Sequence, residues 1–168
     1  ANEPWCYSWL GYMNGVHAPG VKDFDAALAA AHHSALAYAR ATRAMKAVNP
    51  TIRTGFAANM TTYRVDDPNN AELNDLMTLM DGHVNRWWID AAFRGEYPAP
   101  LLDLYGDRFA KIVQPGDMEE LKVGGDFLGI NYYSDSFIST PGPDDKPMSE
   151  GGLFPFPQRS SGKLPQPQ

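Results

Sequence analysis

The sequence has 168 residues, and 43% hydrophobic with 12% aromatic side chains supply enough apolar material for the core of one globular domain. A net charge of −6 argues against a broad nucleic-acid surface, and no apolar segment approaches the roughly 20 residues that a membrane span needs. The single cysteine, Cys6, excludes an intramolecular disulfide and a cysteine-rich zinc module.

The first residue is Ala1 rather than Met, which leaves processing, tag removal or an incomplete chain open. No basic segment followed by an apolar one opens the sequence, so we expect no signal peptide. With one cysteine, a reducing compartment and a cytoplasmic location are the default expectation.

Residues 1–22 are rich in Gly, Pro and aromatic side chains and predict a long loop. A helix is then predicted near residues 25–47, begun by Asp23 or Asp25 as a cap and stopped by Asn49-Pro50. Its apolar stripe is expected at Leu28, Ala31, Ala35, Tyr38, Thr42 and Met45.

A short buried strand is predicted near residues 52–57, ending at Asn59. A second helix follows near residues 70–93 and ends at Gly95. Its buried face is expected to hold Leu73, Leu76, Met77, Met80, Val84, Trp87 and Trp88. A short further helix is predicted in the segment YPAPLLDLYGDRF.

The apolar segment FLGIN predicts a second buried strand near residues 126–131. Helix, strand, helix and strand in this order indicate parallel α/β units. From Thr140 to Gln168 there are seven Pro and four Gly, which is typical of a long loop or tail. We therefore divide the chain into residues 1–134, which hold the regular structure, and residues 135–168, a Pro/Gly-rich part of the same domain.

The residues Asn2, Glu3, Pro4 and Trp5 place a carboxylic acid beside an amide, a rigid proline and a large indole ring. An apolar ring removes water from a neighbouring carboxyl group and thereby favours its protonated form, which an acid catalyst needs. A lone Glu-Pro pair is, however, most often an ordinary surface feature.

Three segments in this order resemble glycoside hydrolase family 1, the β-glucosidase family. ANEPWCYSWLGYMNGVHAPG is similar to that family's Thr-x-Asn-Glu-Pro segment and its Gly-x-His-Ala-Pro-Gly loop. NRWWIDAAFRGEYPAPLL resembles its Asn-Arg-Trp and Phe-Arg-Gly-x-Tyr-Pro signature, and DFLGINYYS its Asp-Phe-x-Gly-x-Asn-Tyr-Tyr strand. Together they extend over nearly all of residues 2–134.

The resemblance implies an α/β fold that is a partial (β/α)8 TIM barrel, from the end of strand 4 to the loop after strand 6. A whole barrel takes about 250 residues, so this chain holds only part of one. The family's Thr-Glu-Asn-Gly segment, which carries the nucleophile, has no match in this sequence. Stand-alone activity is therefore doubtful, and a complementary barrel fragment or self-association is the expected protein partner.

Residue by residue, the resemblance implies that Glu3 is the general acid/base of a retaining β-glucosidase. Asn2 matches the contact to the sugar 2-hydroxyl group. Asn131 and Tyr133 match positions that line the glycone site. The remaining implied substrate-binding positions are Trp5, Cys6 and His17 on the leaving-group side and Asn59 at the rim. Glu3, Asn59 and Asn131 are all expected at the carboxyl ends of strands, where barrel enzymes hold their chemistry.

Several other features have simpler explanations. Trp87 and Trp88 adjoin on a helix and are predicted to be core and rim residues. His32 and His33 are neighbours without metal-ligand spacing, and neither a metal nor a cofactor is expected. Cys6 is expected to be an inert thiol.

Two hypotheses about function remain open. The first is hydrolysis of β-glucosides or related small oligosaccharides by the complete protein, with this chain carrying the acid/base half of the site. The alternative is a non-catalytic sugar-binding remnant or pseudoenzyme. A second carboxylate about 5–5.5 Å from Glu3, which a retaining mechanism requires, distinguishes them.

Overall fold

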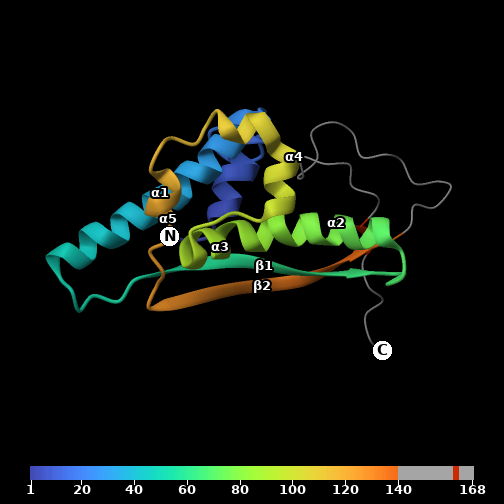
Figure 1. Cartoon of the computed structure of the whole chain (residues 1–168). Helices are drawn as coiled ribbons and strands as arrows, with labels where there is room; N and C mark the ends of the chain where they lie inside the picture. Colours follow the sequence, from blue (N-terminus) through green and yellow to red (C-terminus); the bar gives the residue numbers. More distant parts are fainter. Residues whose placement is uncertain (140–160, 163–168) are drawn as a thin grey trace.

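Two long parallel strands form one layer of the computed structural model, which describes residues 1–139 and 161–162 (Figure 1). β1 (Gly55–Val65) pairs with β2 (Phe127–Ile138), from Gly55 opposite Phe127 to Val65 opposite Ile138. This parallel pairing confirms the prediction of parallel α/β units. The two-residue β3 (Ser161–Gly162) pairs antiparallel with the last residues of β2.

Both strands continue well beyond the predicted bounds of 52–57 and 126–131. The prediction followed the apolar segments alone, whereas the pairing of the strands continues through polar residues such as Thr62 opposite Asp135. Cross-strand contacts accompany it, including an ion pair of 3.5 Å between Arg64 Nε and Asp135 Oδ2. The boundary expected at residue 134 lies inside β2. Of the residues expected to form a Pro/Gly-rich tail, 140–160 and 163–168 lie outside the described residues.

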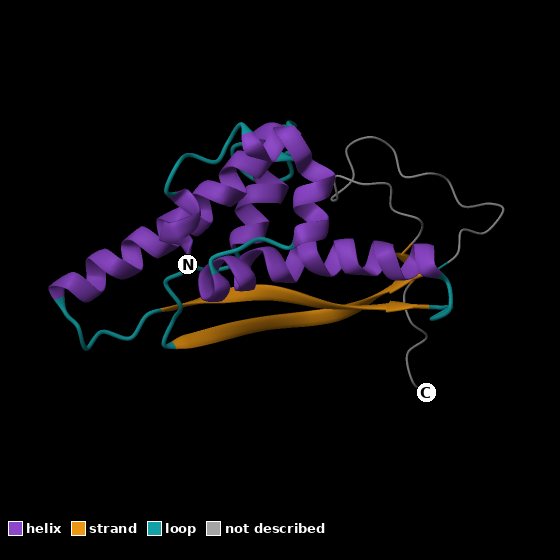
Figure 2. Cartoon of the chain, in the orientation of Figure 1, coloured by secondary structure: helices purple, strands orange, loops and turns teal. Residues whose placement is uncertain are grey.

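The helices of the described residues lie on one face of the strand pair (Figure 2). α1 (Phe24–Val48) begins where the Asp23 carboxylate accepts a hydrogen bond from Ala26 N at 2.8 Å, and it ends at Asn49, as predicted. Met45 was expected on the buried stripe, but it is 42% exposed. The buried positions of α1 end one turn earlier, and they are Ala27, Leu28, Ala31, His32, Leu36, Ala39 and Thr42.

The helix predicted over residues 70–93 consists of three consecutive segments. α2 (Ala71–Asp81) passes into the π-helical η2 (Gly82–Arg86) and then into α3 (Trp87–Arg94). Gly95, in the left-handed region with φ 74°, ends it as predicted. Trp87 and Trp88 are both buried, and the Trp87 ring stacks on Tyr97 with 3.9 Å between centroids, so both belong to the core rather than to a rim.

α4 (Ala99–Ala110) confirms the predicted further helix, whereas α5 (Asp117–Leu121) was missed. The expected loop over residues 1–22 is wrong in its first half, because residues 4–12 are helical and include the π-helical η1 (Cys6–Leu10). Trp9 explains the difference, since its ring is buried against His83, at 4.3 Å, and Phe24, at 5.9 Å. Tertiary packing of aromatic rings thus orders a segment that lacks a helical pattern.

Candidate active site

The first three residues lie alongside β1 as a short parallel extension of the sheet. Asn2 forms a bridge with Ala57, Ala57 N donates to Ala1 O at 3.0 Å, and Glu3 N donates to Ala57 O at 2.8 Å. Residues 1–3, β1 and β2 therefore run side by side. Because residues alternate between the two faces of a strand, and Phe56 and Ala58 are buried on the helical side, Ala57 and Asn59 belong to the opposite face.

Glu3 has an unusual backbone conformation, with φ 44° in the left-handed region, and no other non-glycine residue among those described has a positive φ. This conformation costs on the order of 1–3 kcal/mol for a residue with a side chain and is retained where the surroundings impose it. The surroundings do so here, because Glu3 N is bound to Ala57 and Glu3 O accepts from Cys6 N at 2.9 Å. Strain of this kind gathers at functional sites.

The Glu3 carboxyl group receives hydrogen bonds from three uncharged donors. Asn131 Nδ2 donates to Oε1 at 2.9 Å, and the Tyr133 hydroxyl group donates to the same oxygen at 3.5 Å. The Cys6 thiol donates to Oε2 at 3.6 Å. Asn131 Nδ2 also lies 3.3 Å from Asn2 Oδ1, so residues 128 positions apart in the chain meet at one carboxyl group.

Cys6 is held in its protonated form. Burial, the negative charge of Glu3 and the hydrogen bond to it raise the pKa of the thiol to about 11. A protonated thiol is a donor and a poor nucleophile. These effects agree with the prediction of an inert thiol.

Asn59 lies directly opposite Asn131 in the strand register. Both residues lie in the middle of their strands rather than at the carboxyl ends, because β1 and β2 continue past the apolar segments. Asn59 is half-buried, and its Oδ1 accepts no hydrogen bond from a described residue. Its place in the register puts it next to the Glu3 cluster without a direct contact.

Trp5 and His17, the other two predicted site residues, lie elsewhere. Trp5 is only 8% exposed and packs edge-on against the buried His83 ring, 6.4 Å between centroids. His17 is exposed in the loop after η1, where its backbone bonds to Leu10 and Gly20. Neither side chain is one of the three hydrogen-bond donors to the Glu3 carboxyl group.

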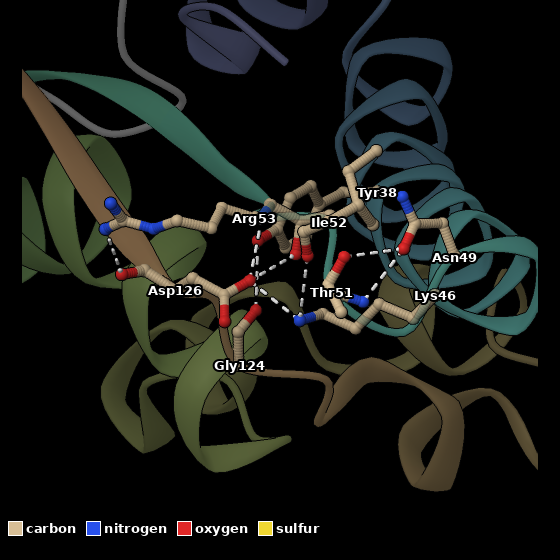
Figure 3. A network of polar contacts seen from close by, with 9 residues as sticks. Tyr38, Lys46, Asn49, Thr51, Ile52, Arg53, Gly124 and Asp126 are labelled. Carbon is tan, nitrogen blue, oxygen red and sulfur yellow. Dashed lines mark hydrogen bonds and ion pairs between the residues drawn. The ribbon is translucent and has the colours of Figure 1, made fainter.

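Another carboxylate, Asp126, lies immediately before β2, at the amino end of the strand pair (Figure 3). Its Oδ2 accepts from Lys46 Nζ at 2.7 Å, Thr54 N at 2.8 Å and Thr54 Oγ1 at 3.2 Å. Chiefly because of Lys46, and then the Thr54 backbone, the pKa of Asp126 falls to about 2. Asp126 belongs to the amino end of the sheet, where it joins α1 to the segment that enters β1.

The structural role of the buried His32 was not predicted from the sequence. Its Nδ1 lies 2.9 Å from the Tyr97 hydroxyl group and its Nε2 lies 3.1 Å from Asp117 Oδ2, which joins α1 to α5. The sequence carried a signal, because Leu28, His32 and Leu36 share one helical face. Among the described residues there is no group of three or more side chains able to hold a metal ion.

Parallel strands, with connecting helices on one face and the site on the other, define part of a (β/α)8 barrel. The model of glycosyl hydrolase family 1 matches residues 1–153, which is most of the chain. The chain belongs to glycosyl hydrolase family 1, as its sequence motifs indicated.

Known relatives carry the name β-glucosidase. The chain is 35% identical over 144 residues to the β-glucosidase of an Agrobacterium species, a match that covers 84% of this chain and 31% of that protein. It is 38% identical over 126 residues to β-glucosidase A of Enterobacter agglomerans, covering 71% of this chain and 25% of the relative. The chain thus spans about a third or less of these relatives.

Solved structures show the same partial overlap. A β-glucosidase from Exiguobacterium marinum superposes with a TM-score of 0.76 at 35% identity, covering 86% of this chain and 33% of the other. For a psychrophilic β-glucosidase from Micrococcus antarcticus the TM-score is 0.77 at 34% identity, covering 87% and 32%. Separately, no helix among the described residues is long and apolar enough to cross a membrane.

Proposed function

We propose that the protein to which this barrel segment contributes hydrolyses β-glycosidic bonds with retention of configuration, as a β-glucosidase. The observation that carries this proposal is the strained Glu3, whose carboxyl group lies among Asn131, Tyr133 and Cys6. The names of the relatives support the same substrate class.

In the proposed reaction, Glu3 acts as the general acid and then as the general base. It protonates the glycosidic oxygen as the leaving group departs, and it later takes a proton from the water that hydrolyses the glycosyl-enzyme. Both steps need a carboxyl group that changes its protonation state. The three neighbours of Glu3 are uncharged donors, so neither state leaves a buried cation without a partner.

The other predicted residues receive roles around this group. Asn2 binds the sugar 2-hydroxyl group, and Asn131 and Tyr133 line the glycone site. Asn59 lies at its rim. Cys6 and His17 are assigned to the leaving-group side, His17 from the loop after η1, and Trp5 supports η1 from the core.

The nucleophile comes, in this proposal, from another part of the barrel. A retaining mechanism needs a second carboxylate about 5–5.5 Å from the acid/base. Within the described residues, the hydrogen bonds of Glu3 lead to an amide, a phenol and a thiol and not to a carboxylate. The same observation favours the second candidate, a sugar-binding remnant that lacks the nucleophile.

Replacing Glu3→Gln in the natural protein that contains this chain tests the proposal. Substrates with poor leaving groups need the proton, so we expect their kcat/KM to fall by about 10²–10⁴-fold, while activated aryl glycosides lose far less in the glycosylation step. The matched control is Glu119→Gln, at an exposed position on α5. Equal losses on both substrate types would assign Glu3 to binding or structure, and sugar binding without any turnover would favour the remnant.

A further inference from the structure

The two oxygens of the Glu3 carboxyl group have different surroundings. Oε1 faces Asn131 Nδ2 at 2.9 Å and the Tyr133 hydroxyl group at 3.5 Å, whereas Oε2 faces the Cys6 thiol at 3.6 Å. An amide nitrogen donates and cannot accept. A proton on Oε1 would therefore point at a donor, whereas the thiol sulfur beside Oε2 can also accept weakly, so the proton of the neutral acid belongs on Oε2.

Cys6 is the immediate neighbour of that oxygen. It lies three residues after Glu3, and the turn that brings it there is closed by the hydrogen bond from Cys6 N to Glu3 O at 2.9 Å. The thiol is half-buried, and burial together with Glu3 raises its pKa, so it meets Oε2 of the ionised carboxylate as a neutral donor.

We propose that Cys6 is a positioning residue for the acid/base: its thiol holds Oε2, the oxygen that transfers the proton, while Asn131 holds Oε1. This inference rests on the proposed function of Glu3. In the first chemical step the Oε2–H bond breaks and the proton moves to the glycosidic oxygen. The bond from the anomeric carbon to that oxygen breaks as a carboxylate nucleophile bonds to the carbon. The thiol keeps its own proton throughout.

The energetic consequence follows from the charge that develops on Oε2. A donor to a carboxylate binds more strongly than the same donor to a neutral acid, so the thiol contact strengthens as the proton leaves. Interactions that strengthen toward the transition state raise kcat rather than tighten substrate binding. Cys6 therefore acts on Glu3 and not, as the family resemblance implies, chiefly on the leaving group.

The first test measures the contact itself and does not depend on activity. The alkylation rate of Cys6 by iodoacetamide is followed against pH in the natural protein that contains this chain, with peptide-resolved mass spectrometry. We expect a midpoint of about 11, which Glu3→Gln lowers toward the ordinary 9.0 without reaching it, because burial is the largest cause of the shift. Tyr133→Phe, which alters only the Oε1 side, leaves the midpoint in place.

The second test is kinetic and compares Cys6→Ala with Cys6→Ser on a glycoside with a poor leaving group. Without the donor, the charge that develops on Oε2 is stabilised less, so Cys6→Ala lowers kcat at constant KM and moves the alkaline limb of the pH profile to higher pH by about half a pH unit. Cys6→Ser keeps a hydroxyl donor and restores the profile. A change confined to KM would place Cys6 at the leaving group instead.

The two failures can be told apart. If Glu3→Gln leaves the pH midpoint of Cys6 alkylation unchanged, the proposed role of Cys6 is wrong, even if hydrolysis depends on Glu3. Absence of Glu3-dependent hydrolysis overturns the proposed function, whatever the thiol titration shows.

Discussion

The β1–β2 pair holds one carboxylate at its amino end and another beside its middle, and their surroundings are opposite in kind. Asp126, at the amino end, is bound by the Lys46 cation and by a backbone amide. Glu3, beside the middle of the strands, is bound only by the neutral donors Asn131, Tyr133 and Cys6 among the described residues. A cation beside a carboxylate favours its ionised form and is left without a counter-charge when the carboxylate is protonated, whereas neutral donors carry no charge that protonation could leave unpaired.

The difference separates structure from chemistry within one sheet. Protonation of Asp126 would leave Lys46 without its counter-charge and would loosen the junction between α1 and β2. Protonation of Glu3 leaves no cation without a counter-charge, because its three donors are uncharged. The location of uncharged donors, rather than the mere presence of a carboxylate, therefore marks the candidate catalytic residue.

The largest effect that we expect concerns the 168-residue chain by itself. Among the described residues, the hydrogen bonds of the Glu3 carboxyl group lead to no second carboxylate. We predict little or no β-glucosidase turnover by the isolated chain. Incubation with a 2-fluoro glycoside, which traps a glycosyl-enzyme, followed by intact mass measurement, checks this. A stoichiometric adduct, with hydrolysis lost in parallel, would show that the chain holds its own nucleophile.

Gly55→Ala is expected to have the next largest effect, at the Asp126 end. A Cβ atom on Gly55 would lie 2.2 Å from the Phe127 carbonyl oxygen, so the strand pair must shift. We expect a loss of about 2 kcal/mol or more in the free energy of unfolding, measured by urea denaturation. Gly129→Ala is the control nearer Glu3, since its Cβ meets the Ala57 side chain at 3.1 Å. An equal cost at both positions would contradict the close approach at Gly55.

Asn131→Ala tests the surroundings of Glu3, and we expect its effect to be smaller than that of Gly55→Ala. Oε1 loses its 2.9 Å donor, and the carboxyl group loses its alignment toward the substrate. In the natural protein we expect kcat on a poor leaving group to fall by roughly tenfold, the equivalent of about 1.4 kcal/mol. Tyr133→Phe removes a 3.5 Å contact and should cost less than about threefold. A larger loss in Tyr133→Phe than in Asn131→Ala would reverse the assigned order.

Much of the helical layer could be predicted because its signals are local. Asp23 begins α1, Asn49 ends it and Gly95 ends α3, each through a bond within a few residues. The lengths of β1 and β2 could not be predicted in this way. Their polar residues belong to the sheet because they pair with the neighbouring strand, whose residues are about 70 positions away in the chain. Helical residues 4–12 were missed for the same reason, since Trp9 is ordered by packing on α1 and η2.

The candidate site was predicted from ordered motifs, and its parts were not equally predictable. Glu3, Asn131 and Tyr133 come together as their motifs implied. Trp5 and His17 do not join them, because burial beside His83 and the path of the following loop depend on the whole fold.

The smallest effect that we expect is the acid response of Asp126. The pKa of this group is lowered from 3.8 to about 2, so its contribution to stability is present above pH 3.8 and is lost as the pH falls toward about 2. Asp126→Asn should lower Tm at neutral pH, and the difference from the natural chain should shrink over that interval. Because about a third of the side chain is exposed, added salt should weaken the difference.

Lys46→Met removes the largest cause of the lowered pKa of Asp126, so the acid transition should move to higher pH. Circular dichroism melts at a series of pH values measure both. A difference between Asp126→Asn and the natural chain that stays constant from pH 5 to about 2 would show that Lys46 does not hold this carboxylate, and the contrast with Glu3 would then lose its electrostatic basis.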